Sequence, residues 1–157
     1  MNLSELIKEH CLNQIQDEKI KNWLDQKLHM IKSDQEFFIS FALINKKIPR
    51  DHLQLTLEQI KNFHRINSEF TIENWTLDQL CRLSLLMNYT LLNLQNLTKL
   101  ISVADTQEQI TIYKSIFYLE NANQYTPLVV DGLRTNIIDI FDAITLNNLY
   151  PTKYFSQ

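Results

Sequence analysis

The sequence predicts an all-α fold, and the first observation behind this is its single glycine in 157 residues. About 7% glycine is ordinary in globular proteins. Phosphate-binding loops, dinucleotide-binding fingerprints and tight hairpins need glycine, because their backbones require positive φ or close approach to a neighbour. An apolar content of 45% is enough to build a buried core. We therefore expect one helical domain over residues 1–157 and neither a nucleotide-binding α/β fold nor a β architecture.

Apolar residues that recur three and four positions apart predict the helices of the first half. They place helices at about residues 4–15, 17–32, 34–47, 57–66 and 77–88. Ser33 and Glu36 form a Ser-x-x-Glu capping pattern before the third helix, and Pro49 ends it because the residue before proline leaves the α region. Thr56, Thr76 and Thr106 each begin a Thr-x-x-Gln pattern, which predicts N-caps; their unequal spacing argues against an internal repeat.

The second half is expected to contain helices at about residues 90–103, 107–120 and 127–146. Pro127 fits the first turn of the last helix, where its missing N–H donor costs nothing. This helix is predicted to be the longest and central, with a face of Val130, Leu133, Ile137, Ile140, Phe141 and Ile144 and with Ile138 buried on another side. Gly132 within it indicates close approach by another backbone. About eight helices result, stacked in a layered, HEAT-like or short superhelical array.

Charge and apolar runs limit the partners and the compartment. The net charge is −3 and the lysines are scattered, so no basic face is expected for nucleic acid. The N-terminal segment carries Glu5 and Glu9 rather than a basic start and an apolar core, and no apolar run is long enough to cross a membrane. Cys11 and Cys81 lie inside helical patterns, which predicts buried thiols in a reducing compartment. We expect a cytoplasmic protein.

The candidate ligand- or partner-binding residues all lie near the C-terminus: Arg134, Asn136, Asp142, Asn148 and Tyr150. At 100° per residue, Arg134 and Asn136 flank the apolar stripe on opposite sides, and Asp142 lies on the far polar face. They cannot converge on one ligand from this helix alone. Arg134 and Asn136 are instead expected to bond loop carbonyls, near Asp105 or in residues 147–151. The other interpretation is that Arg134 holds a ligand carboxylate or phosphate.

No catalytic residue, metal site or cofactor is predicted. Asp139 and Asp142 are spaced like a pair that could hold Mg²⁺ against a diphosphate, but no second acidic motif and no basic pair accompany them. The histidines, His10, His29, His52 and His64, are never four residues apart, so metal binding would need tertiary contact. The serines lie in caps and helices and lack the context of a nucleophile elbow.

The second half also contains an ordered series of motifs that resembles the EboA-domain family over residues 75–155. The motifs are Trp75-Thr-Leu-Asp-Gln79 with Arg82, Ala104-Asp105 with Glu108, the apolar run 113–119, Gly132-Leu-Arg-Thr-Asn136, Ile140-Phe-Asp-Ala-Ile144, Asn148-Leu-Tyr-Pro151 and Tyr154-Phe155. The resemblance marks a structural motif formed by Asp105, Glu108, Gly132, Pro151, Tyr154 and Phe155. Before residue 75 only the helical character agrees.

The chain departs from the family pattern in two places. Leu149 stands where the family usually has proline. The family also usually continues beyond the aromatic pair Tyr154-Phe155 into another helical segment. The chain is therefore expected to be either a short member or a truncated one, and a site completed by that segment would be missing.

The resemblance implies an all-helical bacterial protein encoded with a gene cluster for natural-product precursors, including their export to the periplasm. We expect a non-enzymatic accessory or scaffold protein that binds companion proteins of that cluster or a small metabolite. The alternative is an all-helical enzyme acting on a prenylated or aromatic precursor. Its pocket would contain Arg134 and the Asp139/Asp142 pair.

Overall fold

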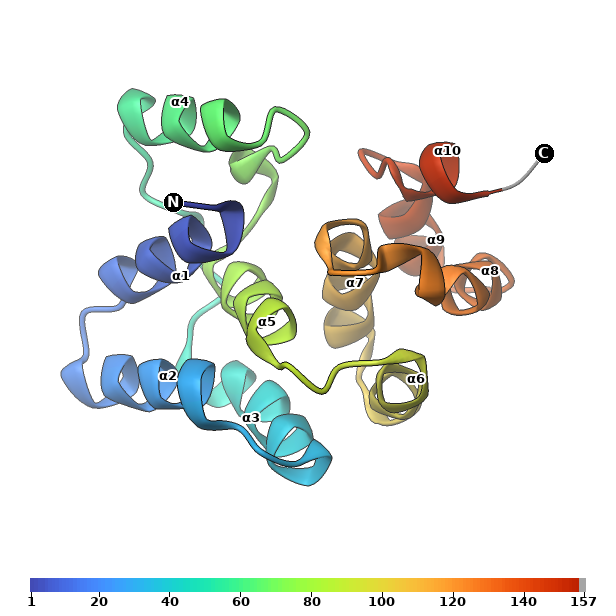
Figure 1. Ribbon diagram of the computed structural model, residues 1–157, viewed down its shortest axis with the longest axis horizontal. Helices are drawn as coiled ribbons and strands as arrows, with labels where there is room; N and C mark the ends of the chain where they lie inside the picture. The colour runs from blue at the N-terminus through green and yellow to red at the C-terminus, as the bar shows by residue number, and fades with distance from the viewer. Residues whose placement is uncertain (156–157) are drawn as a thin grey trace. The chain divides into compact units, whose positions relative to one another are not determined.

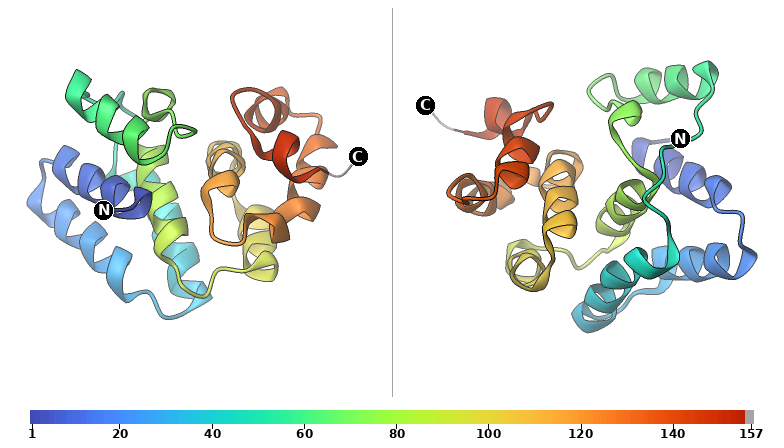
Figure 2. Two further views of the ribbon diagram at one scale, coloured as in Figure 1. Left: turned by 45° about the horizontal axis from the view of Figure 1, so that its top comes forward. Right: turned by 180° about the vertical axis from the view of Figure 1, so that it is seen from behind.

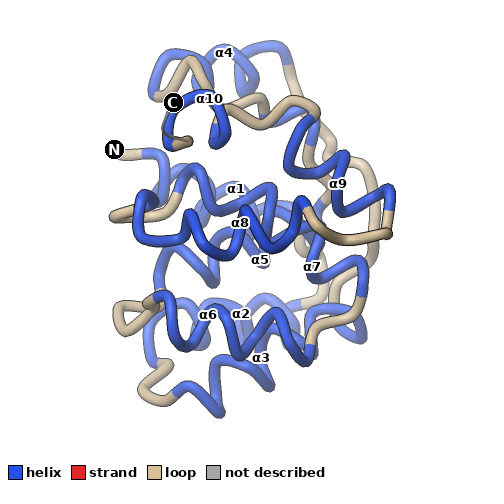
Figure 3. Tube along the Cα trace, turned by 90° about the vertical axis from the view of Figure 1, so that its right-hand side faces the viewer, coloured by secondary structure: helices blue, strands red, loops and turns tan. Residues whose placement is uncertain are grey.

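The computed structural model describes residues 1–155, and this part of the chain consists of helices and connecting turns without a β-strand (Figure 3). The all-α prediction is confirmed, with ten α-helices in the described part where about eight were expected. The chain divides into two compact units, Met1–Tyr89 and Thr90–Gln157, called here the N-terminal and C-terminal units (Figure 1). The expected single domain and its layered or superhelical array stay predictions.

The N-terminal unit is built around its last helix. Its helices are α1 (Leu3–Gln14), α2 (Glu18–Met30), α3 (Asp34–Lys47), α4 (Leu57–Ile66) and α5 (Leu77–Asn88). Helix α5 contacts α1, α2 and α3, which lie around it in two further views (Figure 2). Most of its side chains are buried, including Leu80, Leu83 and Leu86. The core of this unit therefore lies along α5.

Local capping explains why the helices of this unit begin where the sequence predicts. The side chain of Asp17 accepts from the backbone N–H of Lys19 at 2.9 Å and caps α2. Ser33 Oγ accepts from the N–H of Glu36 at 3.2 Å, and Thr56 and Gln59 form a reciprocal capping box. These side chains satisfy donors that a helix start leaves without partners. The predicted starts of α2, α3 and α4 are confirmed.

The two cysteines lie where α1 and α5 pack together. Cys11 and Cys81 are fully buried and neither forms a disulfide. Burial raises the pKa of the Cys81 thiol well above its ordinary value, and a hydrogen bond with the Cys11 side chain acts in the same direction. The prediction of two buried thiols is confirmed.

The C-terminal unit contains α6 (Leu94–Val103), α7 (Thr106–Ser115), α8 (Thr126–Leu133), α9 (Ile138–Thr145) and α10 (Tyr150–Tyr154). Helix α7 packs against α6 and α9, and α9 also contacts α8 and α10. Two expected starts are wrong. Asn93 and Asn96 form a capping box that begins α6 later than residue 90. Asp105 caps α7 by accepting from the N–H of Glu108 at 2.8 Å, so Thr106 is the first helical residue and not the cap.

The prediction of one long central helix at residues 127–146 is wrong. Helix α8 ends at Leu133 and α9 begins at Ile138. In the break, the N–H of Thr135 donates to the carbonyl of Gly132 at 3.2 Å, and Thr135 Oγ1 accepts from the N–H of Ile137 at 3.2 Å. Such short side-chain bonds compete with the helical pattern and end it.

The break also changes which side chains of the last helices are buried. Ile140 and Ile144 are buried as expected. Ile138 is 74% exposed, Phe141 44% and Ile137 42%, so the expected burial of these three residues is wrong. Because α9 is a separate helix, it packs against α7 with its own buried residues, which include Ile140 and Ile144. Ile138 and Phe141 lie on its outer side.

Candidate functional site

The structure does not bring Arg134, Asn136 and Asp142 together through any shared partner. Arg134 follows α8 and its side chain is 76% exposed, with Nη1 3.6 Å from Asp131 Oδ1. Asn136 is exposed in the break between α8 and α9, and Asp142 is half-buried in α9. Within residues 1–155, no hydrogen bond joins the Arg134 or Asn136 side chain to a loop carbonyl, so that expectation is wrong. The reason is the break, which turns both residues toward solvent.

Asn148 and Tyr150, the other two candidates, fix the backbone after α9. Asn148 Nδ2 donates to the carbonyls of Tyr113 at 3.1 Å and Ala143 at 2.9 Å, and its Oδ1 accepts from the N–H of Tyr150 at 2.9 Å. The fully buried Tyr150 hydroxyl donates to the carbonyl of Ala122 at 2.7 Å and lies 2.9 Å from Thr126 Oγ1. Their polar atoms are thus engaged inside the C-terminal unit.

The Tyr150 ring belongs to an aromatic cluster that holds the end of the described chain. Its centroid lies 4.6 Å from that of Tyr154 and 6.2 Å from that of Phe155. Pro151 lies in the first turn of α10, where its missing donor is harmless. These residues of the family signature have structural contacts in the C-terminal unit, as does Asp105 at its cap.

Gly132 is explained by side chains rather than by the backbone neighbour that was expected. A Cβ atom at this position would lie 2.6 Å from Ile144 Cδ1 and 2.7 Å from Tyr113 Cζ. Both distances are shorter than carbon atoms tolerate. Close packing at Gly132 is confirmed. The expected neighbour is wrong, because side chains and not another backbone approach the glycine.

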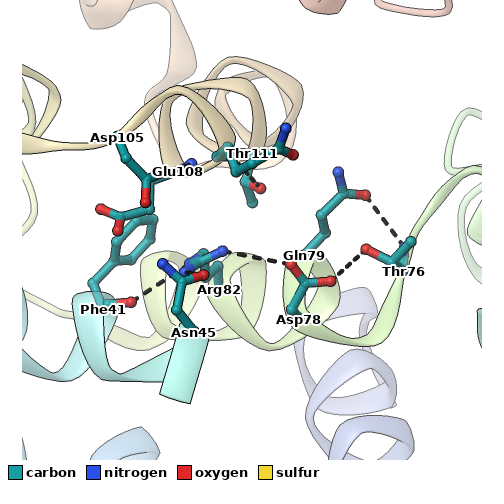
Figure 4. A network of polar contacts seen from close by, with 10 residues as sticks. Phe41, Asn45, Thr76, Asp78, Gln79, Arg82, Asp105, Glu108 and Thr111 are labelled. Carbon is teal, nitrogen blue, oxygen red and sulfur yellow. Dashed lines mark hydrogen bonds and ion pairs between the residues drawn. The ribbon is translucent and has the colours of Figure 1, made fainter. Parts of the chain in front are cut away.

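The most buried charged group of the N-terminal unit is Arg82, which was not among the predicted site residues (Figure 4). Its Nη2 donates to Asn45 Oδ1 at 2.6 Å, its Nη1 lies 3.6 Å from Asp78 Oδ2, and its Nε donates to the carbonyl of Phe41 at 3.5 Å. Thr76 Oγ1 donates to the other Asp78 oxygen at 2.5 Å. A signal was present in the sequence, because Asp78 and Arg82 are four apart in a mostly apolar helix.

The Arg82 network holds α3 to α5. Its charge is fully enclosed, with side-chain exposures of 0% for Arg82 and 5% for Asp78. Removing one partner of such a buried ion pair strongly destabilises the folded protein, because the other charge is left buried and uncompensated. We interpret it as a structural element, because its groups contact one another and the backbone.

A hollow of about 760 Å³ in the N-terminal unit is the better candidate for a binding site. It is called here the polar hollow, and it lies among the end of α1, the start of α2, the end of α3 and the extended segment before α4. The residues that line it are Asn13, Gln14, Ile15, Gln16, Asp17, Ile20, Lys47, Ile48, Pro49, Asp51, His52, Gln54 and Leu77. A volume in this range is typical of small-molecule sites.

The extended segment that forms one wall of the polar hollow is fixed by hydrogen bonds. Gln14 Nε2 donates to the carbonyl of Gln54 at 2.9 Å, and Gln14 Oε1 accepts from the N–H of Gln54 at 3.3 Å. His52 forms an isolated antiparallel bridge with Thr76, and the N–H of Leu77 donates to the carbonyl of Asp51 at 2.9 Å. The wall is therefore attached to both α1 and the start of α5.

The lining of the polar hollow offers several groups that can bond a ligand. Asp17 is used to cap α2, and Lys47 Nζ lies 5.1 Å from the centre of the Trp23 ring. Within residues 1–155, no hydrogen bond or ion pair engages the side chains of Asp51 or His52. A carboxylate that is not bonded elsewhere can accept from ligand hydroxyl or ammonium groups, and a neutral imidazole can donate or accept.

Other kinds of site have less support in the described part of the chain. Residues 1–155 contain no group of three or more His, Cys, Asp and Glu side chains that could hold a metal ion. Asp139 is exposed and Asp142 half-buried on α9. The helices that the structure describes include none long and apolar enough to cross a membrane.

The polar hollow could not be recognised from sequence motifs, because its lining comes from segments spread over residues 13–77.

The comparison with curated proteins gave no match, and the comparison with solved structures gave none either. A family model described as "Metabolite traffic protein EboA" matches residues 3–157. The match includes the N-terminal half, where the sequence alone showed only helical character. The chain therefore belongs to the EboA family of metabolite traffic proteins.

Proposed function

We propose that this protein is a non-enzymatic accessory protein that binds a small metabolite in the polar hollow. The observation that carries the proposal is the hollow itself, about 760 Å³ in volume, with a wall fixed by Gln14 and with the Asp51 and His52 side chains available to a ligand. The family description as metabolite traffic proteins supports it. We propose that the metabolite belongs to a bacterial pathway that makes or exports natural-product precursors.

The chemistry of the lining favours a polar ligand without negative charge. The lining contains two carboxylates, Asp17 and Asp51, and one ammonium group, Lys47. Asn13, Gln14 and Gln16 add amide groups, and Ile15, Ile20, Ile48 and Leu77 add apolar surface. A metabolite with hydroxyl or amino groups on a compact carbon skeleton fits this combination. The two buried free thiols of Cys11 and Cys81 support a cytoplasmic location for this binding.

The test is a pull-down from the native cell followed by mass spectrometry of both small molecules and proteins. The wild type is compared with Asn13→Trp, which fills the polar hollow from an exposed position, and with Asn22→Trp, the same change at an exposed position of α2 outside it. We expect a small molecule to copurify with the wild type and Asn22→Trp and to be lost from Asn13→Trp. Equal recovery with all three proteins would reject the hollow as its site.

A scaffold function that binds companion proteins is the second candidate, and exposed apolar side chains favour it. Ile137, Ile138 and Phe141 at α9 are 42%, 74% and 44% exposed. Leu146 and Leu149, in the turn that follows α9, are also exposed. Apolar groups gathered on a surface are typical of protein contact sites. Recovery of companion proteins without a metabolite, abolished by Phe141→Asp, would support this function over metabolite binding.

A further inference from the structure

A second pocket in the N-terminal unit differs from the polar hollow in position and in charge. It lies beside α4 and the turn after it, has a volume of about 590 Å³, and is called here the α4 pocket. Its lining residues are Ile60, Lys61, His64, Arg65, Phe70, Thr71 and Glu73. None of them lines the polar hollow.

A packed aromatic cluster lies behind the α4 pocket and holds its lining in place. Phe70 is 1% exposed, and its ring is stacked against Trp75 with centroids 5.5 Å apart. Phe63, on the inner face of α4, lies 5.7 Å from Phe70 and 5.6 Å from the ring of His10. These contacts fix α4 and Phe70 relative to each other. Because these aromatic contacts already hold the lining in place, binding a ligand would not cost the entropy of ordering it.

The basic residues of the pocket share one face of α4. Lys61, His64 and Arg65 are three and four positions apart, which places their side chains side by side on the helix. Arg65 Nη1 donates to Asn62 Oδ1 at 3.0 Å, and this bond orients the guanidinium from one edge. Like charges four residues apart repel each other.

Lys61 and Arg65 are both exposed, so water weakens their repulsion without removing it. In residues 1–155, no acidic side chain forms an ion pair with either of them, although Glu73 lines the same pocket. An anion between the two cations would remove the repulsion and would accept charge-assisted hydrogen bonds. Thr71 can donate a further hydrogen bond from its hydroxyl, and His64 from a ring nitrogen.

We propose that the α4 pocket is a second binding site, for a small organic anion with an aromatic or branched apolar body. Lys61 and Arg65 bind the anionic group, and the half-buried Ile60, which lies in the same pocket as the packed Phe70 ring, contacts the apolar body. Glu73 opposes excess negative charge and so limits the number of ionised groups that the ligand carries. The α4 pocket and the polar hollow then select ligands of different charge, and the α4 site does not depend on the function proposed for the hollow.

The test uses phenyl phosphate, with inorganic phosphate and phenol as probes of its two halves. Binding is followed by amide chemical shifts of the full chain at low ionic strength. We expect phenyl phosphate to shift signals from residues 60–73 and to bind at least about ten-fold more tightly than either half, because charge and apolar contact act together. Equal, weak binding of phenyl phosphate and inorganic phosphate would overturn the proposal.

Two variants make the charge assignment specific. Lys61→Gln/Arg65→Gln is expected to weaken phenyl phosphate binding about ten-fold or more. Lys19→Gln/Lys32→Gln removes two exposed charges, one in α2 and one just after it, and should leave binding unchanged. Glu73→Gln is expected to strengthen binding by a few-fold, because a negative charge leaves the pocket. Loss of fold is checked by circular dichroism, and the gain with Glu73→Gln cannot come from misfolding. A similar loss in both double variants, or weaker binding with Glu73→Gln, would reject the site.

Discussion

The N-terminal and C-terminal units use their polar side chains in different ways. In the C-terminal unit, Asn148 and Tyr150 bond backbone carbonyls and hold α10 against its neighbours. In the N-terminal unit, the Arg82 network holds the core, while Asp51 and His52 of the polar hollow and Lys61 of the α4 pocket lie exposed at its surface. Most of the family motif therefore marks the architecture of the C-terminal unit, and the binding surfaces that we propose lie in the N-terminal unit, which offers fewer sequence signals.

The largest effect is expected from Arg82→Met in the N-terminal unit. The change leaves the Asp78 carboxylate buried without its guanidinium, which should lower the free energy of unfolding by about 3–5 kcal/mol. Urea denaturation followed by circular dichroism measures the loss. Adding Asp78→Asn removes the unpaired charge and should restore part of the stability. A loss below about 1 kcal/mol, which is the range of exposed pairs, would contradict the structural interpretation.

The next effect concerns Gly132 in the C-terminal unit. Gly132→Ala places a methyl group against Ile144 and Tyr113, and overpacking of this kind costs about 1–3 kcal/mol. The better helix propensity of alanine offsets roughly 1 kcal/mol, so the net loss should be at most about 2 kcal/mol. Thermal unfolding measures it. A more stable Gly132→Ala variant would show that the close packing is absent.

Tyr150→Phe should have a smaller effect in the same unit. It removes the hydroxyl that donates to the carbonyl of Ala122 and contacts Thr126, and a buried hydrogen bond contributes about 0.5–1.5 kcal/mol. Tyr154→Phe is the matched control, since within residues 1–155 no hydrogen bond engages the Tyr154 hydroxyl. Chemical denaturation of both variants compares them. Equal losses of stability in the two variants would mean that the hydroxyl of Tyr150 does not fix the segment between α9 and α10.

The smallest effect is a pH dependence that belongs to the N-terminal unit. Burial lowers the pKa of His10 below its ordinary value of 6.5, against a smaller opposite effect of Glu9. Well above pH 6.5 His10 is neutral in both the folded and the unfolded chain. Below it the unfolded chain takes up the proton first, so stability falls until the pH passes the lowered pKa of the folded protein. His10→Leu should remove this part of the slope when unfolding is measured between pH 5 and 8. An unchanged slope would contradict a neutral, buried His10.

How far the sequence predicted the structure depends on the range of the interactions. Ser33, Thr56 and Asp17 act within their own first turns, so the starts of α2, α3 and α4 were predicted correctly. The break after α8 was missed although Thr135 is also a local signal, because the apolar spacing continued through it. An apolar period alone cannot separate one long helix from two short helices in line.

The candidate site was less predictable than the helices. Arg134 looked functional because a cation beside the apolar stripe could hold a ligand carboxylate or phosphate, yet it lies exposed beside Asp131. Asp51 and His52 belong to a segment without helical or strand periodicity, and only tertiary contacts place them beside Gln14 and Asp17. Side chains assembled from distant segments leave no spacing pattern in a single sequence.

The most direct test of metabolite binding in the polar hollow is hydrogen–deuterium exchange of the full chain with and without a small-molecule extract of the native cell. The wild type should gain protection in peptides covering residues 13–20 and 47–54 when the extract is added, and Asn13→Trp should not. Arg134→Ala, altered in the C-terminal unit, should behave like the wild type. Protection confined to residues 134–150, or protection that persists in Asn13→Trp, would contradict binding in the polar hollow.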